Sequence, residues 1–185
     1  ATSYYNQYKN STAVIDGIEI SGSTKNLCDS LNDDTTDSNT NRANFTPRLE
    51  QPAGNDRHYF SGENIFYASG YGMPNCTAYA YGRAYEILGT KPNLCGGNAE
   101  QWYDYNKNGG YYPYGNKAKL GAIAVWSHPG GGHVAVVEKI ENGQITFSNS
   151  AYARYDLFFY TNTVAEDDPN ANIDDTWTLL GYIYI

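Results

Sequence analysis

The spacing of apolar side chains predicts one amphipathic helix near the middle of the chain, between Asn75 and Gly89. Apolar positions recur there at intervals of three and four, which places them on one face of a helix. Asn75 suits the N-cap position, and Gly89 suits the position just past the last turn. Gly82, inside the expected helix, indicates a close backbone contact with a neighbouring element. The positions on the buried face are Cys76, Tyr79, Ala80, Ala84, Ile87 and Leu88.

After Leu120 the pattern changes to short apolar runs, which are typical of strands. Asn142-Gly143, between two of these runs, predicts a two-residue hairpin turn. A second, shorter helix is expected at 98–105, with Asn98 as its cap. Helices followed by antiparallel strands predict an α+β fold. The expected strands are 122–126, 133–140, 144–150, 154–164 and 177–185.

The N-terminal part of the chain is much more polar. Residues 13–20 form one candidate strand, broken by the hairpin-turn dipeptide Asp16-Gly17. Residues 21–57 are rich in Ser, Thr, Asn and Asp, which favours a long loop or arm. The acidic run at 32–41 lacks the spacing of a calcium-binding loop, so a solvated loop is favoured over a calcium site. We therefore expect a polar, partly extended arm at 1–54 and a folded domain at 55–185.

Length and charge narrow the classes of function. A chain of 185 residues suits one domain with an additional arm. The net charge is −8 and no basic cluster is present, which argues against binding to nucleic acid or to an anionic membrane surface. No apolar run approaches the roughly 20 residues that span a bilayer. The chain begins at Ala1 without a visible signal segment, as expected for a processed protein or a piece of a longer one.

The three cysteines, Cys28, Cys76 and Cys95, are an odd number, so at least one is free or pairs with another chain. Cys76 falls in the first turn of the expected helix, where the helix dipole and unpaired N–H groups favour a thiolate nucleophile. The alternative is a small buried apolar residue. If Cys76 is reactive, Cys28 and Cys95 are left to pair. No Cys-x-x-Cys motif or His/Cys cluster indicates zinc.

Two further residues complete a candidate catalytic set. A thiol needs a base, and the base needs an orienting group. His133 opens a strand just after three glycines, and Asn149 lies near the end of the next strand. The turn at 142–143 pairs 141 with 144, which places His133 opposite position 152, so contact with Asn149 requires a bulge or a bend. His128 and His58 are alternative bases.

Three blocks of sequence together resemble the CHAP domain, the cysteine, histidine-dependent amidohydrolase/peptidase family of phage endolysins, tail lysins and bacterial autolysins. The cysteine block and the histidine block are specific in combination. The resemblance covers about residues 55–185. It implies a papain-like, NlpC/P60-like α+β fold, with N-terminal helices packed on an antiparallel sheet of five to six strands. The blocks are 75–83, 120–126 and 132–138, with further similarity at 97–102 and 148–152.

The resemblance also implies a reaction and a site. The expected activity is hydrolysis of an amide bond in peptidoglycan, by an N-acetylmuramoyl-L-alanine amidase or a cross-bridge endopeptidase. Cys76 is then the nucleophile, His133 the base and Asn149 the residue that orients the base. Tyr79, Trp102 and Trp126 are candidates for lining the groove, with packing in the core as the alternative for each. The alternatives are a non-catalytic wall-binding module on the same fold and a cysteine amidase with a substrate outside the wall.

The resemblance implies no cofactor. Some members of the family bind calcium through acidic residues before the cysteine, for which this chain offers Asp56 and Glu63. The expected partner is peptidoglycan, and the protein is expected to be a monomer. It is expected to act outside the cell or, if encoded by a phage, on the wall of the host. Because the chain is acidic and bacterial walls are anionic, we expect a separate wall-binding module to supply targeting.

Overall fold

The computed structural model describes residues 13–15, 18–20, 45–172 and 176–185, and the chain divides into two compact units, 1–37 and 38–185. In the first unit, β1 (Ala13–Ile15) and β2 (Ile18–Ile20) pair antiparallel, so the single broken strand expected at 13–20 is two short strands. The turn dipeptide, the acidic run at 32–41 and Cys28 lie outside the described residues.

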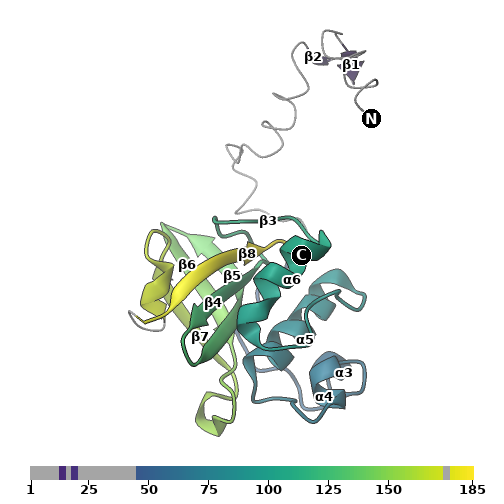
Figure 1. The fold of residues 1–185 in the computed structure, drawn as a ribbon, viewed down its shortest axis with the longest axis vertical. Coiled ribbons are helices and arrows are strands. Elements are labelled where there is room, and N and C mark those ends of the chain that lie inside the picture. The colour runs from purple at the N-terminus through teal and green to yellow at the C-terminus, as the bar shows by residue number, and fades with distance from the viewer. Residues whose placement is uncertain (1–12, 16–17, 21–44, 173–175) are drawn as a thin grey trace. The chain divides into compact units, whose positions relative to one another are not determined.

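The second unit consists of helices followed by strands, so the predicted α+β fold is confirmed (Figure 1). Its six strands form one antiparallel sheet in the order β3-β8-β4-β5-β6-β7. The helices are α3 (Arg57–Phe60), α4 (Ile65–Ala68), α5 (Cys76–Leu88) and α6 (Trp102–Gly109), with short 3-10 helices η1 (Ala99–Gln101), η2 (Tyr155–Leu157) and η3 (Pro169–Asn172). The strands are β3 (Tyr114–Gly115), β4 (Ile123–His128), β5 (Gly131–Glu141), β6 (Gln144–Asn149), β7 (Tyr160–Ala165) and β8 (Thr178–Ile183).

Helix α5 begins and ends where its sequence predicts. The Asn75 side chain accepts a hydrogen bond from the Thr77 N–H at 3.1 Å, and Gly89 ends the helix with φ = 69°. Gly82 faces α3 so closely that a Cβ atom would lie 2.6 Å from the Tyr59 ring. The close contact that Gly82 indicates is therefore confirmed, and it lets α3 pack directly on the backbone of α5.

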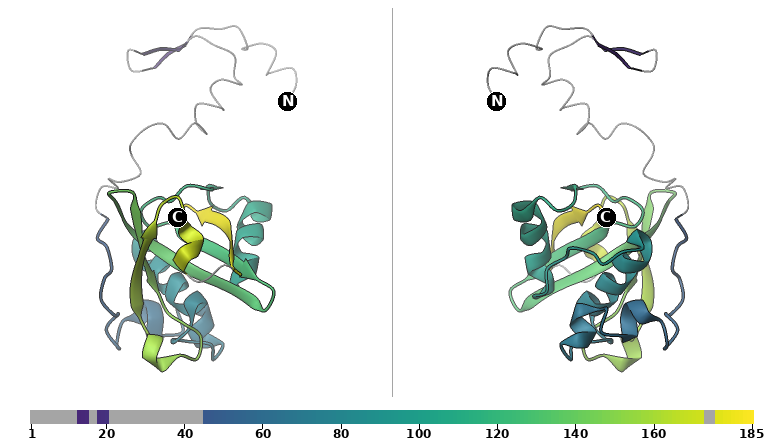
Figure 2. Two further views of the ribbon diagram at one scale, coloured as in Figure 1. Left: turned by 90° about the vertical axis from the view of Figure 1, so that its left-hand side faces the viewer. Right: turned by 90° about the vertical axis from the view of Figure 1, so that its right-hand side faces the viewer.

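Alternate residues of the central strands fill two apolar clusters. Val125, Val134 and Val136 pack against the helices, while Ala124, Trp126 and Ala135 fill the cluster on the opposite face of the sheet. Figure 2 shows that α6 lies at the far end of the helix layer from α3 and α4. The buried face of α5 packs against the central strands β4 and β5.

A bulge interrupts the pairing of β5 with β6. From the turn, Glu141 pairs with Gln144 and Lys139 with Thr146, as the two-residue turn predicts. Beyond Glu138 the register shifts by one residue, so that Val137 pairs with Phe147. An extra residue in one strand shifts every later pairing by one residue. The later side chains of β5 therefore share a face with a different set of β6 side chains. This shift decides which residues of β6 share a face with His133.

Some elements differ from the predicted ones. The second helix starts as η1 and continues as α6 to Gly109, and β7 begins at Tyr160 because η2 occupies 155–157. The pair β3–β8 was not predicted, since a two-residue strand leaves no periodic pattern. Residues before the predicted boundary at 54/55 contact the sheet, since the Arg48 N–H donates to Glu138 of β5.

Candidate active site

Cys76 is the first residue of α5, and its side chain is 8 % exposed. Burial raises the pKa of the Cys76 thiol to about 11, although the backbone N–H groups of Val134, Thr77 and Cys76 itself act in the opposite direction. The thiolate expected from the helix dipole alone is therefore not the resting form, because desolvation outweighs the amides. The sulfur lies beside the backbone of β5, at the residue that follows His133.

His133 and Asn149 share one face of the sheet because of the bulge at Glu138. In the shifted register His133 lies opposite position 151, which makes Asn149 a diagonal neighbour two residues away. His133 Nε2 and Asn149 Oδ1 are 2.9 Å apart. Without the bulge the two side chains would point to opposite faces. The contact that the sequence left dependent on a bulge is thus made through one.

The hydrogen bonds of Asn149 fix the tautomer of His133. The Asn149 amide donates from Nδ2 to Asn162 Oδ1 at 2.7 Å, so its oxygen faces the imidazole. A carbonyl oxygen only accepts, so His133 Nε2 carries the hydrogen and Nδ1 is left with a lone pair. Burial lowers the pKa of His133, and the bond from Asn149 raises it by less. The ring is therefore neutral at neutral pH and can accept a proton at Nδ1.

The thiol and the imidazole are not hydrogen-bonded to each other, although the sulfur lies beside the amide of the residue that follows His133. Within the described residues, no hydrogen bond joins the Cys76 sulfur to the His133 ring, which lies against Trp126 with ring centroids 5.9 Å apart. The sulfur instead faces the Val134 amide. Catalytic hydrogen bonds are often longer without substrate and tighten in the complex.

A buried ion pair joins the three elements of this site. Arg83 of α5 bonds Glu138 of β5 through two bonds of 2.9 Å, and the Ser148 hydroxyl of β6 donates to the same carboxylate at 2.8 Å. Glu138, the bulged residue, is fully buried. Because Ser148 precedes Asn149, this network holds the cysteine helix, the histidine strand and the asparagine strand together.

Two residues near the sulfur had no signal in the sequence. Glu100 of η1 lies within electrostatic range of Cys76 and raises the thiol pKa, and its Oε2 is buried without a hydrogen-bond partner. A Cβ on Gly132 would lie 2.7 Å from that oxygen, so the glycine before His133 allows the approach. Tyr160, opposite Asn149, has its pKa raised to about 12 by burial and by Cys76, so its phenol stays protonated.

Replacing Glu100 by glutamine should make Cys76 more reactive. Removing the negative charge lowers the thiol pKa, so below that pKa the thiolate fraction and the rate of alkylation by iodoacetamide rise by about three-fold. The rate is measured by mass spectrometry of the Cys76 peptide. Glu141→Gln, which makes the same charge change about 23 Å along β5 from Val134, should leave it unaltered. An unchanged or slower rate in Glu100→Gln would contradict this account.

Of the two places considered for the three aromatic residues, groove and core, the structure has all three in the core. Tyr79, Trp102 and Trp126 are all 0 % exposed, so they build the core and cannot touch a substrate in this structure. The helical and strand periods place them on buried faces. The alternative base His128 stacks on Trp177 at 4.7 Å and accepts at Nδ1 from the Gly130 N–H.

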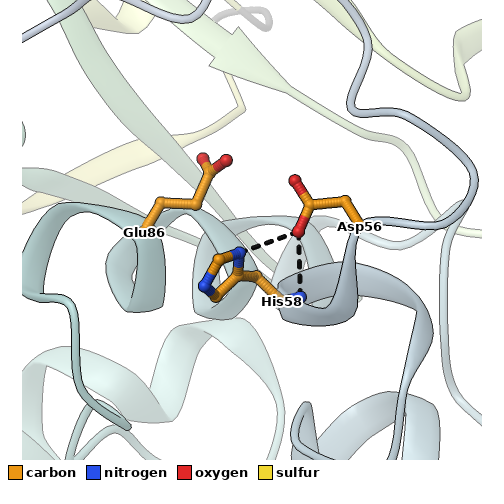
Figure 3. Close-up of side chains that lie close together, drawn as sticks. All are labelled: Asp56, His58 and Glu86. Atoms are coloured by element: carbon orange, nitrogen blue, oxygen red, sulfur yellow. Dashed lines mark hydrogen bonds and ion pairs between the residues drawn. The ribbon is translucent and has the colours of Figure 1, made fainter.

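The acidic residues before the cysteine are already paired with arginines. Asp56, His58 and Glu86 come within 4.8 Å of one another, and His58 donates to Asp56 at 2.7 Å (Figure 3). The Arg48 guanidinium bonds Glu86 and lies 3.9 Å from Asp56. Glu63 pairs with Arg57 at 3.2 Å. The Arg48 guanidinium thus lies against both carboxylates of this cluster and offsets part of their charge.

The other free thiol of the described residues, Cys95, is half-buried, and its proposed partner Cys28 lies outside the described part. Where the structure describes the chain, no helix has the length and apolar character needed to cross a membrane.

Comparison of the sequence with known proteins finds a match to one family model. A search of curated proteins finds no match. The family model of the CHAP domain matches residues 66–151, a segment that includes Cys76, His133 and Asn149. Domains of this family are generally cysteine- and histidine-dependent amidohydrolases or peptidases that act on the cell wall. Residues 66–151 of this chain therefore belong to the CHAP domain family.

Proposed function

We propose that this domain hydrolyses an amide bond of peptidoglycan, with Cys76 as nucleophile, His133 as general base and Asn149 as the residue that orients His133. The observation that carries the proposal is the hydrogen bond between His133 Nε2 and Asn149 Oδ1. This bond leaves His133 Nδ1 as the proton acceptor. His133 is the residue just before Val134, whose amide faces the Cys76 sulfur.

The proposed reaction follows from the protonation states. His133 Nδ1 removes the thiol proton as the sulfur attacks the substrate carbonyl, because both groups are neutral at rest. The tetrahedral intermediate collapses to a thioester when the imidazolium gives its proton to the leaving amine. Water, activated by the same nitrogen, then hydrolyses the thioester and restores the thiol. The Cys76 N–H at the start of α5 is the proposed donor to the oxyanion.

The charge of the chain bears on how it reaches its substrate. With a net charge of −8, the chain is repelled by anionic wall polymers. We therefore assign targeting to a separate wall-binding module and expect the catalytic domain to act as a monomer, outside the cell or at the wall of a phage host.

Chemical analysis of digested walls tests the proposal. Amide hydrolysis releases one new amino group for each cut and no reducing sugar, whereas cleavage of the glycan releases reducing ends. The chain is incubated with purified walls, and both groups are titrated over time. We expect amino groups alone to increase. Release of reducing sugar, or binding to walls with neither product, would overturn the proposal, and the second outcome would favour a non-catalytic wall-binding module.

A further inference from the structure

A second surface feature adjoins the start of α5. A cavity of about 430 Å³ lies between the α4–α5 connection and the segment that follows β6. Four tyrosines line it: Tyr67, Tyr71, Tyr152 and Tyr155. Three are largely exposed, at 58 % for Tyr71, 64 % for Tyr152 and 80 % for Tyr155.

The cavity is fixed to the candidate active site. Its wall includes Pro74, two residues before Cys76 and so at most about 7 Å from it along the chain. The Ala153 N–H donates to the Pro74 carbonyl at 3.2 Å, and the Asn75 N–H donates to the Ser150 hydroxyl at 3.0 Å. The Asn75 side chain also donates to the Tyr71 carbonyl at 2.9 Å. Asn75, the N-cap of α5, is thus hydrogen-bonded to the segments on both sides of the cavity.

The residues that line the cavity favour a neutral ligand. None of the lining residues carries a charge. The nearest ionic side chains in sequence, Arg154 and Asp156, bond each other at 2.9 and 2.6 Å. A tyrosine offers a flat apolar ring and a hydroxyl that donates and accepts. A sugar ring matches this surface with an apolar C–H face and a rim of hydroxyl groups. A stem peptide brings charges that find no partner here.

We propose that this cavity, the tyrosine pocket, binds one sugar ring of the glycan strand. Taken together with the proposed function, on which this step rests, the pocket would place the amide that joins the glycan to its peptide nearest the Cys76 sulfur. The domain then cuts that amide and spares the cross-bridge.

Binding of a neutral sugar tests the pocket without requiring catalysis. The full chain is titrated with N,N′-diacetylchitobiose and followed by NMR. We expect shifts at backbone amides of 70–74 and 152–155. Tyr71→Ala and Tyr152→Ala should each weaken binding by about ten-fold. Tyr105→Ala, which removes an exposed tyrosine of α6 outside the pocket, should not. Tyr155→Ala provides a third variant if either of the first two misfolds.

The outcomes separate this proposal from the function on which it builds. The sugar subsite would be overturned if a sugar-free stem tripeptide shifts these amides and chitobiose does not. It would also be overturned if neither probe causes a shift. Both results leave amide hydrolysis standing. Sugar binding by a chain that releases no amino groups would overturn the function and leave the subsite. If sugar binds but the released amines belong to cross-bridge residues, the assignment of the cut is overturned.

Discussion

Replacing Cys76 by alanine is expected to lower the rate of amide hydrolysis by about 10⁵-fold or more, because no thioester can form without the sulfur. The rate is measured by release of amino groups from purified walls. Cys95→Ala is the matched control, since it removes the other free thiol of the described residues. Cys95→Ala should keep the wild-type rate. A Cys76→Ala variant that still cuts amides at an appreciable rate would exclude Cys76 as the nucleophile.

The base has a matched control as well. His133→Ala should lower kcat/KM by about 10²–10⁴-fold, the usual contribution of a positioned general base. His128→Ala, which removes a ring stacked on Trp177, should keep most of the activity. Because burial lowers the pKa of His133 from 6.5 and the neutral ring is the base, kcat/KM should fall only as the pH drops through that lowered value. A midpoint above 6.5 would contradict this assignment.

Removing one partner of the buried ion pair is expected to lower the free energy of unfolding by about 3–5 kcal/mol. The variant is Arg83→Met, which leaves the fully buried Glu138 without its two guanidinium bonds. Urea denaturation followed by circular dichroism measures the change. Glu141→Gln, which breaks the exposed Lys139–Glu141 pair, should cost less than about 1 kcal/mol.

The double variant Arg83→Met with Glu138→Leu separates the cost of an unpaired charge from the loss of the pair itself. It should recover much of the stability lost in Arg83→Met, because no charge is then left buried alone. If Arg83→Met is no less stable than the wild type, the ion pair does not hold α5, β5 and β6 together, and their arrangement depends on apolar packing alone.

The sequence predicted α5 well because everything that defines this helix is local. The Asn75 cap, the three-to-four spacing of apolar residues and the Gly89 end all lie within one stretch of chain. The Asn142-Gly143 turn is local in the same sense. It correctly gave the first pairs of the β5–β6 hairpin, Glu141 with Gln144 among them.

The relation of His133 to Asn149 could not be derived in the same way. It depends on the bulge at Glu138, and that bulge lies where Glu138 meets Arg83, 55 residues away. A contact of this separation leaves no periodic pattern in β5. The resemblance to a family placed Asn149 in the site, whereas the turn geometry alone placed it on the wrong face.

The aromatic residues show the limit of composition. Tyr79, Trp102 and Trp126 have the size and chemistry of groove residues, but their faces are the buried ones. The exposed tyrosines are in connecting segments, where no period distinguishes an inward from an outward side chain. Glu100 had no signal in the sequence for the same reason, since only the fold of η1 against Gly132 brings it near Cys76.

If Cys76 and His133 act as a pair, the rate at which iodoacetamide alkylates Cys76 depends on His133. The rate is followed by peptide mass spectrometry across the pH range in the wild type and in His133→Ala, with Cys95 as a reference thiol in each sample. We expect a wild-type rate at neutral pH about ten-fold or more above that of the variant, falling off below pH 6.5. Superimposable profiles for the two proteins, both rising only toward the thiol pKa of about 11, would contradict it.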